Sequence, residues 1–305
     1  MSIAASASAA PLRANLICMA SMLIWAAALP AADVLIPNVP ALPLTAARMM
    51  LAGLTLLPLW WVSEGGAVVL RAPWVRGIGI GTLIAAGALC LVLGQALTDA
   101  VTVSIVAASM PVIGIALEVL LDGRKLRFGL VLGMMLSLLG GTFALLGNGL
   151  GLNLGLGAAF SFGSVLLFTV GSRLSVTALP GLSPIGRTAI TLCGAGIASS
   201  AAALIAFSLG AEGPNWAVLG VKDLAALLMF SVAGLGISQV LWIMSIGSLG
   251  IGLAALHINA TPFYVMLILY ALGGEWNWYQ VLGAAVVGLG VLIAQGVLRL
   301  PRAQG

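Results

Sequence analysis

The sequence predicts an all-α integral membrane protein with ten transmembrane helices, arranged as two inverted five-helix repeats. Of its 305 residues, 62% are hydrophobic and only 7% are charged, whereas a soluble domain carries about 25% charged residues. The apolar residues fall into windows of membrane-spanning length, and the same series of prolines, charges and glycines occurs in each half. These observations exclude a soluble protein and indicate a chain made of two related halves.

Each predicted helix follows from an apolar window of about 20 residues, the length that crosses the hydrocarbon core of a bilayer. The first window is followed by Ala31-Ala32-Asp33 and also resembles a secretory signal peptide, but its only basic residue is Arg13. We interpret it as the first transmembrane helix. The links between windows are short and rich in turn residues, so no soluble domain is expected. The predicted helices cover residues 15–36, 44–62, 74–97, 102–121, 128–146, 152–172, 185–209, 224–246, 251–272 and 278–298.

The basic residues predict that both termini are cytoplasmic, because Lys and Arg are more frequent on the cytoplasmic side of membrane proteins. In this orientation only Arg48 and Lys222 lie on the outer side, and the even number of helices agrees with it. The expected location is the plasma membrane, as a multi-pass protein of a bacterial inner membrane. The basic residues on the cytoplasmic side are Arg13, Arg71, Arg76, Arg124, Lys125, Arg127, Arg173, Arg187, Arg299 and Arg302.

A repeated series of residues divides the chain into two halves, residues 1–150 and 151–305. In each half a proline, Pro111 or Pro262, follows a run of small and polar residues, and a charged residue, Arg124 or Glu275, stands 13 positions later. Because five helices per half is an odd number, the second half enters the membrane in the opposite orientation. Inverted repeats are common in secondary transporters, which bind substrate near the membrane midplane and move one repeat against the other. The next helix of each half carries two glycines seven residues apart, Gly133 and Gly140 or Gly283 and Gly290.

The segment 251–272 is predicted to be a spanning helix with a break near its middle. Pro262 cannot donate a backbone hydrogen bond, so the carbonyl of Ile258 loses its usual partner. In hydrocarbon that carbonyl must find another donor or line a wet cavity. The two prolines are therefore predicted hinges, and polar residues beside such a break indicate a functional site. The alternative is a kinked packing helix whose polar groups are satisfied. The polar residues beside the break are His257, Asn259 and Thr261.

Three further helices carry polar residues together with aromatic residues or methionine along one face, at helical spacing. On the first of them the face consists of Asn15, Cys18, Met22 and Trp25, and on the other two the polar residues are mainly serines. Such faces suit a zwitterion with a bulky apolar side chain. The alternative for each serine is helix packing, because small residues let backbones approach. The alternative for Trp242 is the aromatic belt at the membrane interface. The predicted substrate-binding residues are Trp25, Met22, Ser161, Ser164, Phe168, Ser238, Trp242, His257 and Asn259.

The motifs of both halves also resemble those of a known family. The second half shows Ser245, Pro262-Phe263, Gly274-Glu275, Val281-Leu282-Gly283-Ala284 and Leu289-Gly290-Val291-Leu292, and the first shows Leu97, Pro111-Val112, Leu132-Gly133 and Gly140. With these motifs the chain resembles the EamA type of the drug/metabolite transporter superfamily, and more closely the YddG-like exporters of aromatic amino acids and related metabolites. The resemblance implies ten helices in two inverted halves, and export as the direction of transport. The family's glutamate is kept as Glu275 but is replaced by Arg124 in the first half.

The predicted function is a secondary transporter that exports amino acids, aromatic or bulky neutral ones, or related small metabolites. An intramembrane enzyme acting on lipid-linked substrates and a passive channel remain alternatives, although the sequence has no HExxH or GxSxG motif. No catalytic residue, cofactor or metal is expected, because one histidine and three scattered cysteines cannot build a metal site.

The expected partners are an amino acid-like small molecule and the lipid bilayer. Nucleic acid is not expected, because the twelve basic residues form no basic face. The chain is expected to be a monomer or a weak homodimer. Asp99, beyond the outer end of the third predicted helix, is expected to be a solvated loop residue.

The predicted orientation places Gly123 inside the cell. In a variant without the native cysteines, Gly123→Cys and Ser6→Cys should react with an impermeant thiol reagent only after the membrane is opened. Gly213→Cys should react in intact cells. Labelling of Gly123→Cys from the outside of intact cells would contradict this orientation.

Overall fold

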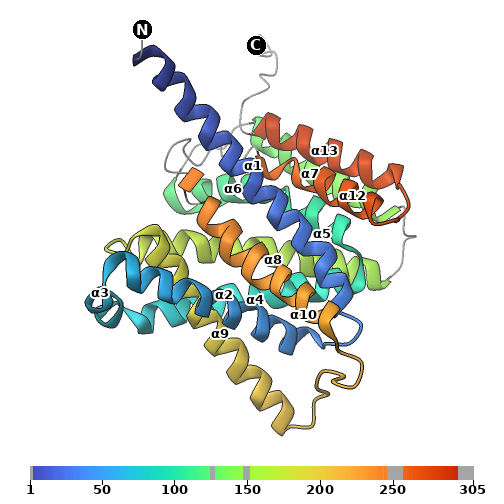
Figure 1. Cartoon of the computed structure of the whole chain (residues 1–305). Coiled ribbons are helices and arrows are strands. Elements are labelled where there is room, and N and C mark those ends of the chain that lie inside the picture. The colour runs from blue at the N-terminus through green and yellow to red at the C-terminus, as the bar shows by residue number, and fades with distance from the viewer. Residues whose placement is uncertain (1–2, 124–127, 147–151, 243, 246–256, 295–305) are drawn as a thin grey trace.

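The computed structural model describes residues 3–123, 128–146, 152–242, 244–245 and 257–294, and these residues form helices and turns without a strand (Figure 1). The prediction of an all-α protein is confirmed for this part of the chain. Two shorter apolar helices, Thr261–Ala271 and Trp278–Ile293, accompany the longer ones. Seven described stretches are long and apolar enough to cross a membrane: Arg13–Leu35, Ala41–Glu64, Trp74–Leu97, Ala100–Leu121, Gly155–Thr177, Pro184–Ser208 and Val221–Trp242.

The helical elements follow each other with short links, and the π-helix η1 continues α10 directly. In chain order they are α1 (Ile3–Leu35), α2 (Ala41–Glu64), α3 (Gly66–Arg71), α4 (Trp74–Leu97), α5 (Ala100–Ala107), α6 (Met110–Asp122), α7 (Phe128–Leu146), α8 (Leu152–Thr177), α9 (Pro184–Ser208), α10 (Val221–Leu228), η1 (Met229–Ile237), α12 (Thr261–Ala271) and α13 (Trp278–Ala294).

Pro262 does not lie near the middle of a helix, and this part of the prediction is wrong. It is the second residue of α12. The N–H groups of the first turn of a helix have no partner within the helix, so a proline there removes no hydrogen bond. Most of the preceding predicted segment, residues 251–256, lies outside the described residues.

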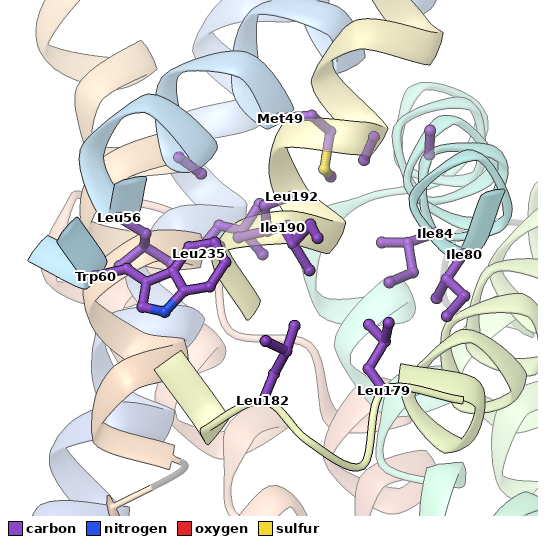
Figure 2. Close-up of a cluster of buried hydrophobic side chains, with 14 of the residues drawn as sticks. Met49, Leu56, Trp60, Ile80, Ile84, Leu179, Leu182, Ile190, Leu192 and Leu235 are labelled. Carbon is purple, nitrogen blue, oxygen red and sulfur yellow. The ribbon is translucent and has the colours of Figure 1, made fainter. Parts of the chain in front are cut away.

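Buried apolar side chains form two large clusters, and each cluster joins helices from both halves of the sequence. The first lies between α2, α4 and α9, with the link that follows α8 (Figure 2). The second lies between α1, α5, α6, α12 and α13. We call the helices around the first cluster group A and those around the second group B. The bundle is therefore not divided along the boundary between residues 1–150 and 151–305.

A third, smaller cluster connects the two groups at one end of the bundle. It joins the last turns of α1, where Leu35 is buried, to Leu44 of α2, Val92 of α4 and Phe230 of η1. All of these residues lie toward the end of the bundle that carries the link 36–43, which the charge distribution assigns to the outer side. In Figure 1 this part of α1 runs beside α10, in agreement with their packing.

The helices of group A approach so closely that α4 needs a glycine at the contact. A Cβ atom on Gly81 would lie 2.5 Å from both the carbonyl oxygen of Thr191 and the backbone nitrogen of Ala195 on α9. Real Cβ atoms do not come this close to backbone atoms, so any side chain at position 81 would separate the two helices.

Adding one methyl group to α4 should therefore change the stability of the protein differently at two neighbouring glycines. Gly81→Ala should lower the stability in detergent by about 1–3 kcal/mol, as overpacking does. Gly79→Ala is the matched control, because Gly79 is not buried and a Cβ atom there would meet no other atom within 4 Å; it should be neutral or slightly stabilising. Equal melting temperatures for the two variants would contradict the close contact between α4 and α9.

Candidate functional site

Two helix breaks lie at the same position relative to a proline in the two halves of the chain. In the first half, a turn at 108–109 separates α5 from α6, and Pro111 is the second residue of α6. In the second half, a turn at 259–260 follows the helical residues 257–258, and Pro262 is the second residue of α12. The two breaks therefore share their length and their distance from the proline.

Matching backbone hydrogen bonds hold the two turns. The N–H of Ser109 donates to the carbonyl of Val106 at 3.0 Å, and the N–H of Ala260 donates to the carbonyl of His257 at 3.1 Å. Each bond connects residues three apart, at equal distances from the respective proline. The backbone therefore takes the same course at both breaks.

The side chains at the two breaks differ. At the first, the hydroxyl of Ser109 donates to the carbonyl of Val106 at 2.6 Å and is satisfied. At the second, Oδ1 of Asn259 and Oγ1 of Thr261 are buried and have no hydrogen-bond partner among the described residues. An unpaired buried polar atom costs about 1–3 kcal/mol. These two atoms mark the second break as the place where a polar ligand would find an acceptor and a hydroxyl.

The helix that begins just after the second break, α12, belongs to group B. α12 packs against α1 and α5. Trp25 of α1 is half-buried and packs on the cluster that contains Val265 and Met266 of α12, and Met22, about one turn earlier on α1, is buried. His257 is half-buried. The structure thus places four of the predicted residues, Trp25, Met22, His257 and Asn259, on α1 and on the segment directly before α12, and α12 packs against α1.

Two of the predicted serines take part in helix packing. The hydroxyl of Ser161 donates to the carbonyl of Gly157 at 2.8 Å and lies against Gly94 of α4. The hydroxyl of Ser238 donates to the carbonyl of Gly234 at 2.6 Å, and its own carbonyl accepts from Ser21 of α1 at 2.6 Å. Both hydroxyls have partners in the described structure. Ser164 is also buried, on the face of α8 that packs against α4.

A small cavity lies between α4, α8, α9 and the helix that contains η1. Its volume is about 40 Å³, which holds a few water molecules at most. Phe168 is the one predicted site residue that lines it, and Trp242 is half-buried at the end of the stretch Val221–Trp242. The predicted residues therefore do not share this cavity. Its polar lining consists of Ser172, Ser175, Thr188, Thr191 and Gln239.

Arg48, which the charge count placed on the outer side, is a buried charge in the first half of α2. Its side chain is only 3% exposed. Its Nε donates to the carbonyl of Phe230 at 3.2 Å, and its guanidinium carbon lies 3.9 Å from the centre of the Phe230 ring. A charged side chain inside a spanning helix is costly unless it has a partner in the protein. An arginine within an apolar window was therefore the sequence feature that could have indicated a buried, partnered charge. The side chain clamps α2 to η1.

Polar side chains also connect the helices at the end that carries the link 36–43. Nε2 of Gln95 on α4 donates to the carbonyl of Leu29 at 2.6 Å and to Oδ1 of Asp33 at 2.8 Å, both on α1. Asp99 is not a solvated loop residue as expected. It caps α5 by accepting from the N–H of Thr102 at 2.8 Å, and it accepts from Gln280 of α13 at 3.0 Å.

Removing the amide of Gln95 should destabilise this end of the bundle. In Gln95→Met, the half-buried carboxylate of Asp33 and the carbonyl of the buried Leu29 lose their donor, so we expect a loss of about 1–3 kcal/mol in the free energy of unfolding. Ala96→Met is the control, since Ala96 is exposed on the same helix. The measurement is thermal unfolding in detergent, and a melting temperature of Gln95→Met equal to that of Ala96→Met would contradict the contribution of these bonds.

Comparisons with known proteins agree with this architecture. Residues 12–146 match the EamA-like transporter family. A stretch of 84 residues, 28% of this chain, is 36% identical to the "Uncharacterized transporter YyaM" of Bacillus subtilis (strain 168). This match spans 27% of that relative's length.

A solved structure, titled only "Crystal structure of protein", shares the fold. Its TM-score is 0.67, with 22% sequence identity, over 96% of this chain and 99% of the other. At this identity the similarity concerns the fold alone. The matched family and the curated relative are both described as transporters.

Proposed function

From the match of residues 12–146 to the EamA-like transporter family, we propose that the chain is a secondary transporter with ten transmembrane helices in two inverted repeats. It exports amino acids, aromatic or bulky neutral ones, or related small metabolites by alternating access. The observation that carries the proposal is the second helix break, where Asn259 and Thr261 present buried polar atoms without a described partner. Broken helices at the interface between inverted repeats are where such transporters bind substrate.

The arrangement of the helices supports the inverted repeat. If each helix of the first half corresponds to one of the second, α2 corresponds to α9 and α7 to α13, and these are the two most closely packed corresponding pairs. The contact of α4 with α8 then corresponds to that of η1 with α1, and both contacts are present. The two helix breaks, which have the same length and the same distance from a proline, are a further correspondence between the halves.

The chemistry of the second break suits a zwitterion. Oδ1 of Asn259 would accept a hydrogen bond from an ammonium group, and the hydroxyl of Thr261 would donate to or accept from a polar group of the substrate. Trp25 and Met22, on the adjacent helix, would contact an aromatic or aliphatic side chain. His257 would line the same site. Ser161, Ser164, Phe168, Ser238 and Trp242 are proposed to lie along the path between the two groups of helices.

Alternating access would move group A against group B rather than one sequence half against the other. Each group has its own buried cluster, whereas the third cluster and the bonds of Gln95 and Asp99 connect the groups at one end. The described conformation is thus closed at that end, which the charge distribution assigns to the outside. Pro111 and Pro262 are proposed hinges, because each closely follows a two-residue turn; the side chain of Pro111 lies outside the described residues. Both termini are proposed to be cytoplasmic, in a bacterial inner membrane.

Substitutions at the second break test the proposed site. Asn259→Leu and Thr261→Val keep the approximate volume but remove the polar atoms, so each should weaken substrate binding by about 1–3 kcal/mol, or roughly 5- to 150-fold. The measurement is the concentration dependence of uptake into proteoliposomes for a panel of neutral amino acids. Thr82→Val is the control, because its hydroxyl is exposed and bonds only to its own helix, at the carbonyl of Ile78.

Two outcomes would contradict the proposal. If uptake by the wild-type protein does not saturate for any amino acid of the panel, the chain is not a transporter of this class. If uptake saturates but Asn259→Leu and Thr261→Val keep the apparent affinity of Thr82→Val, the substrate binds elsewhere.

A further inference from the structure

A groove with two arginines lies at one end of the bundle. It runs between α3 with the start of α4 and the link between α8 and α9, and its volume is about 490 Å³. Arg71 and Arg76 are its charged lining residues, and no acidic side chain lines it. Apolar side chains, among them Val68, Leu179 and Leu182, form the rest of the wall. The groove is therefore cationic on one part of its surface and apolar on another.

Hydrogen bonds fix the first wall of the groove. The chain reverses after α2 at Gly65, whose φ of 88° suits a residue without a side chain. The indole N–H of Trp74 donates to the carbonyl of Val69 in α3 at 2.8 Å. The ring of Trp74 packs near that of the buried Trp60, with 6.3 Å between ring centres. α3 is thereby held against the start of α4.

The second wall is equally held in place. Arg187 of α9 donates from Nε to the carbonyl of Leu179 at 2.9 Å and from Nη2 to the carbonyl of Pro180 at 3.0 Å. The hydroxyl of Ser183 donates to the carboxylate of Glu64 at the end of α2, which ties this link to the first wall. The two walls therefore keep their spacing, and the groove is part of the folded structure.

The groove lies at the depth of the lipid headgroups. It is built where the spans Ala41–Glu64 and Gly155–Thr177 end and where Trp74–Leu97 and Pro184–Ser208 begin. Leu70 and Val75, the neighbours of the two arginines, are 71% and 87% exposed, as expected of side chains that face lipid. Arginines at the ends of spanning helices extend toward the interface. Arg71 and Arg76 therefore stand where phosphates of the bilayer are found.

We propose that this groove binds the headgroup of an anionic phospholipid, with the lipid phosphate between Arg71 and Arg76 and an acyl chain along the apolar wall. Guanidinium groups bind phosphate oxygens through paired, charge-assisted hydrogen bonds. Basic residues near an anionic membrane surface each contribute about 1 kcal/mol to lipid binding. The inference does not depend on what the protein transports.

The test is lipid binding to the purified full-length protein in mild detergent. Native mass spectrometry compares phosphatidylglycerol with phosphatidylcholine of the same acyl chains. We expect the wild-type protein to prefer phosphatidylglycerol, and Arg71→Gln/Arg76→Gln to bind it about 30-fold more weakly, which is about 2 kcal/mol at 1.4 kcal/mol per tenfold. Arg13→Gln/Lys222→Gln removes the same charge at exposed positions outside the groove and should keep the wild-type affinity.

Three results would overturn the proposal. The first is an equal affinity of the wild-type protein for the two lipids, which is informative even if the arginine variant does not fold. The second is an equal loss of affinity for phosphatidylglycerol in the two double variants. The third is a rise in melting temperature with inorganic phosphate alone that equals the rise with phosphatidylglycerol, because the site would then take phosphate and not a lipid headgroup.

Discussion

Every backbone N–H and C=O inside a membrane needs a partner within the protein, and the rest of the structure depends on this constraint. The two helix breaks interrupt the regular helical hydrogen bonds beside Pro111 and Pro262, so the backbone at the breaks must be covered by protein and not exposed to lipid. Group B provides this cover, because its apolar cluster contains residues of α5, α6 and α12 together with α1 and α13. At the first break a serine hydroxyl also bonds the backbone, whereas two polar atoms at the second have no partner among the described residues. The two breaks thus share their backbone geometry but differ in whether the described polar side chains are satisfied.

The contacts within group A differ in kind from those between the two groups. Group A is held by close backbone contacts such as that of Gly81 with α9, which favour a rigid body. The groups are joined at one end by the third, smaller apolar cluster and by polar contacts, for example the bonds of Gln95 to α1. Polar bonds that exchange partners cost less to rearrange than a packed apolar core, because protein interiors respond to shape changes with strain. A transporter with this structure would open by separating the groups at these polar contacts.

The sequence predicted the features that depend on composition and local chemistry. Hydropathy predicted the all-α membrane fold, and the prolines predicted where the spans 102–121 and 251–272 are interrupted. That α12 begins at Thr261 was not predictable, because a proline is equally compatible with a kink and with a helix start. The burial of Arg48 depends on a carbonyl 182 residues away, and the bond of Ser21 to Ser238 spans 217 residues. The groove is likewise built from two links that lie far apart in the sequence, so only the folded chain reveals it.

Distances between the two groups test the central claim, alternating access, most directly. Spin labels at Val75 and Leu120 would report the distance between the groups at the end that carries α3, and labels at Leu209 and Tyr279 would report it at the opposite end. All four residues are exposed. In each pair the first residue belongs to group A or flanks it, and the second belongs to group B. Measured by double electron–electron resonance in lipid nanodiscs, the two distances should change in opposite directions when a transported amino acid is added. Two distances that both stay constant, or that both change in the same direction, would contradict the account.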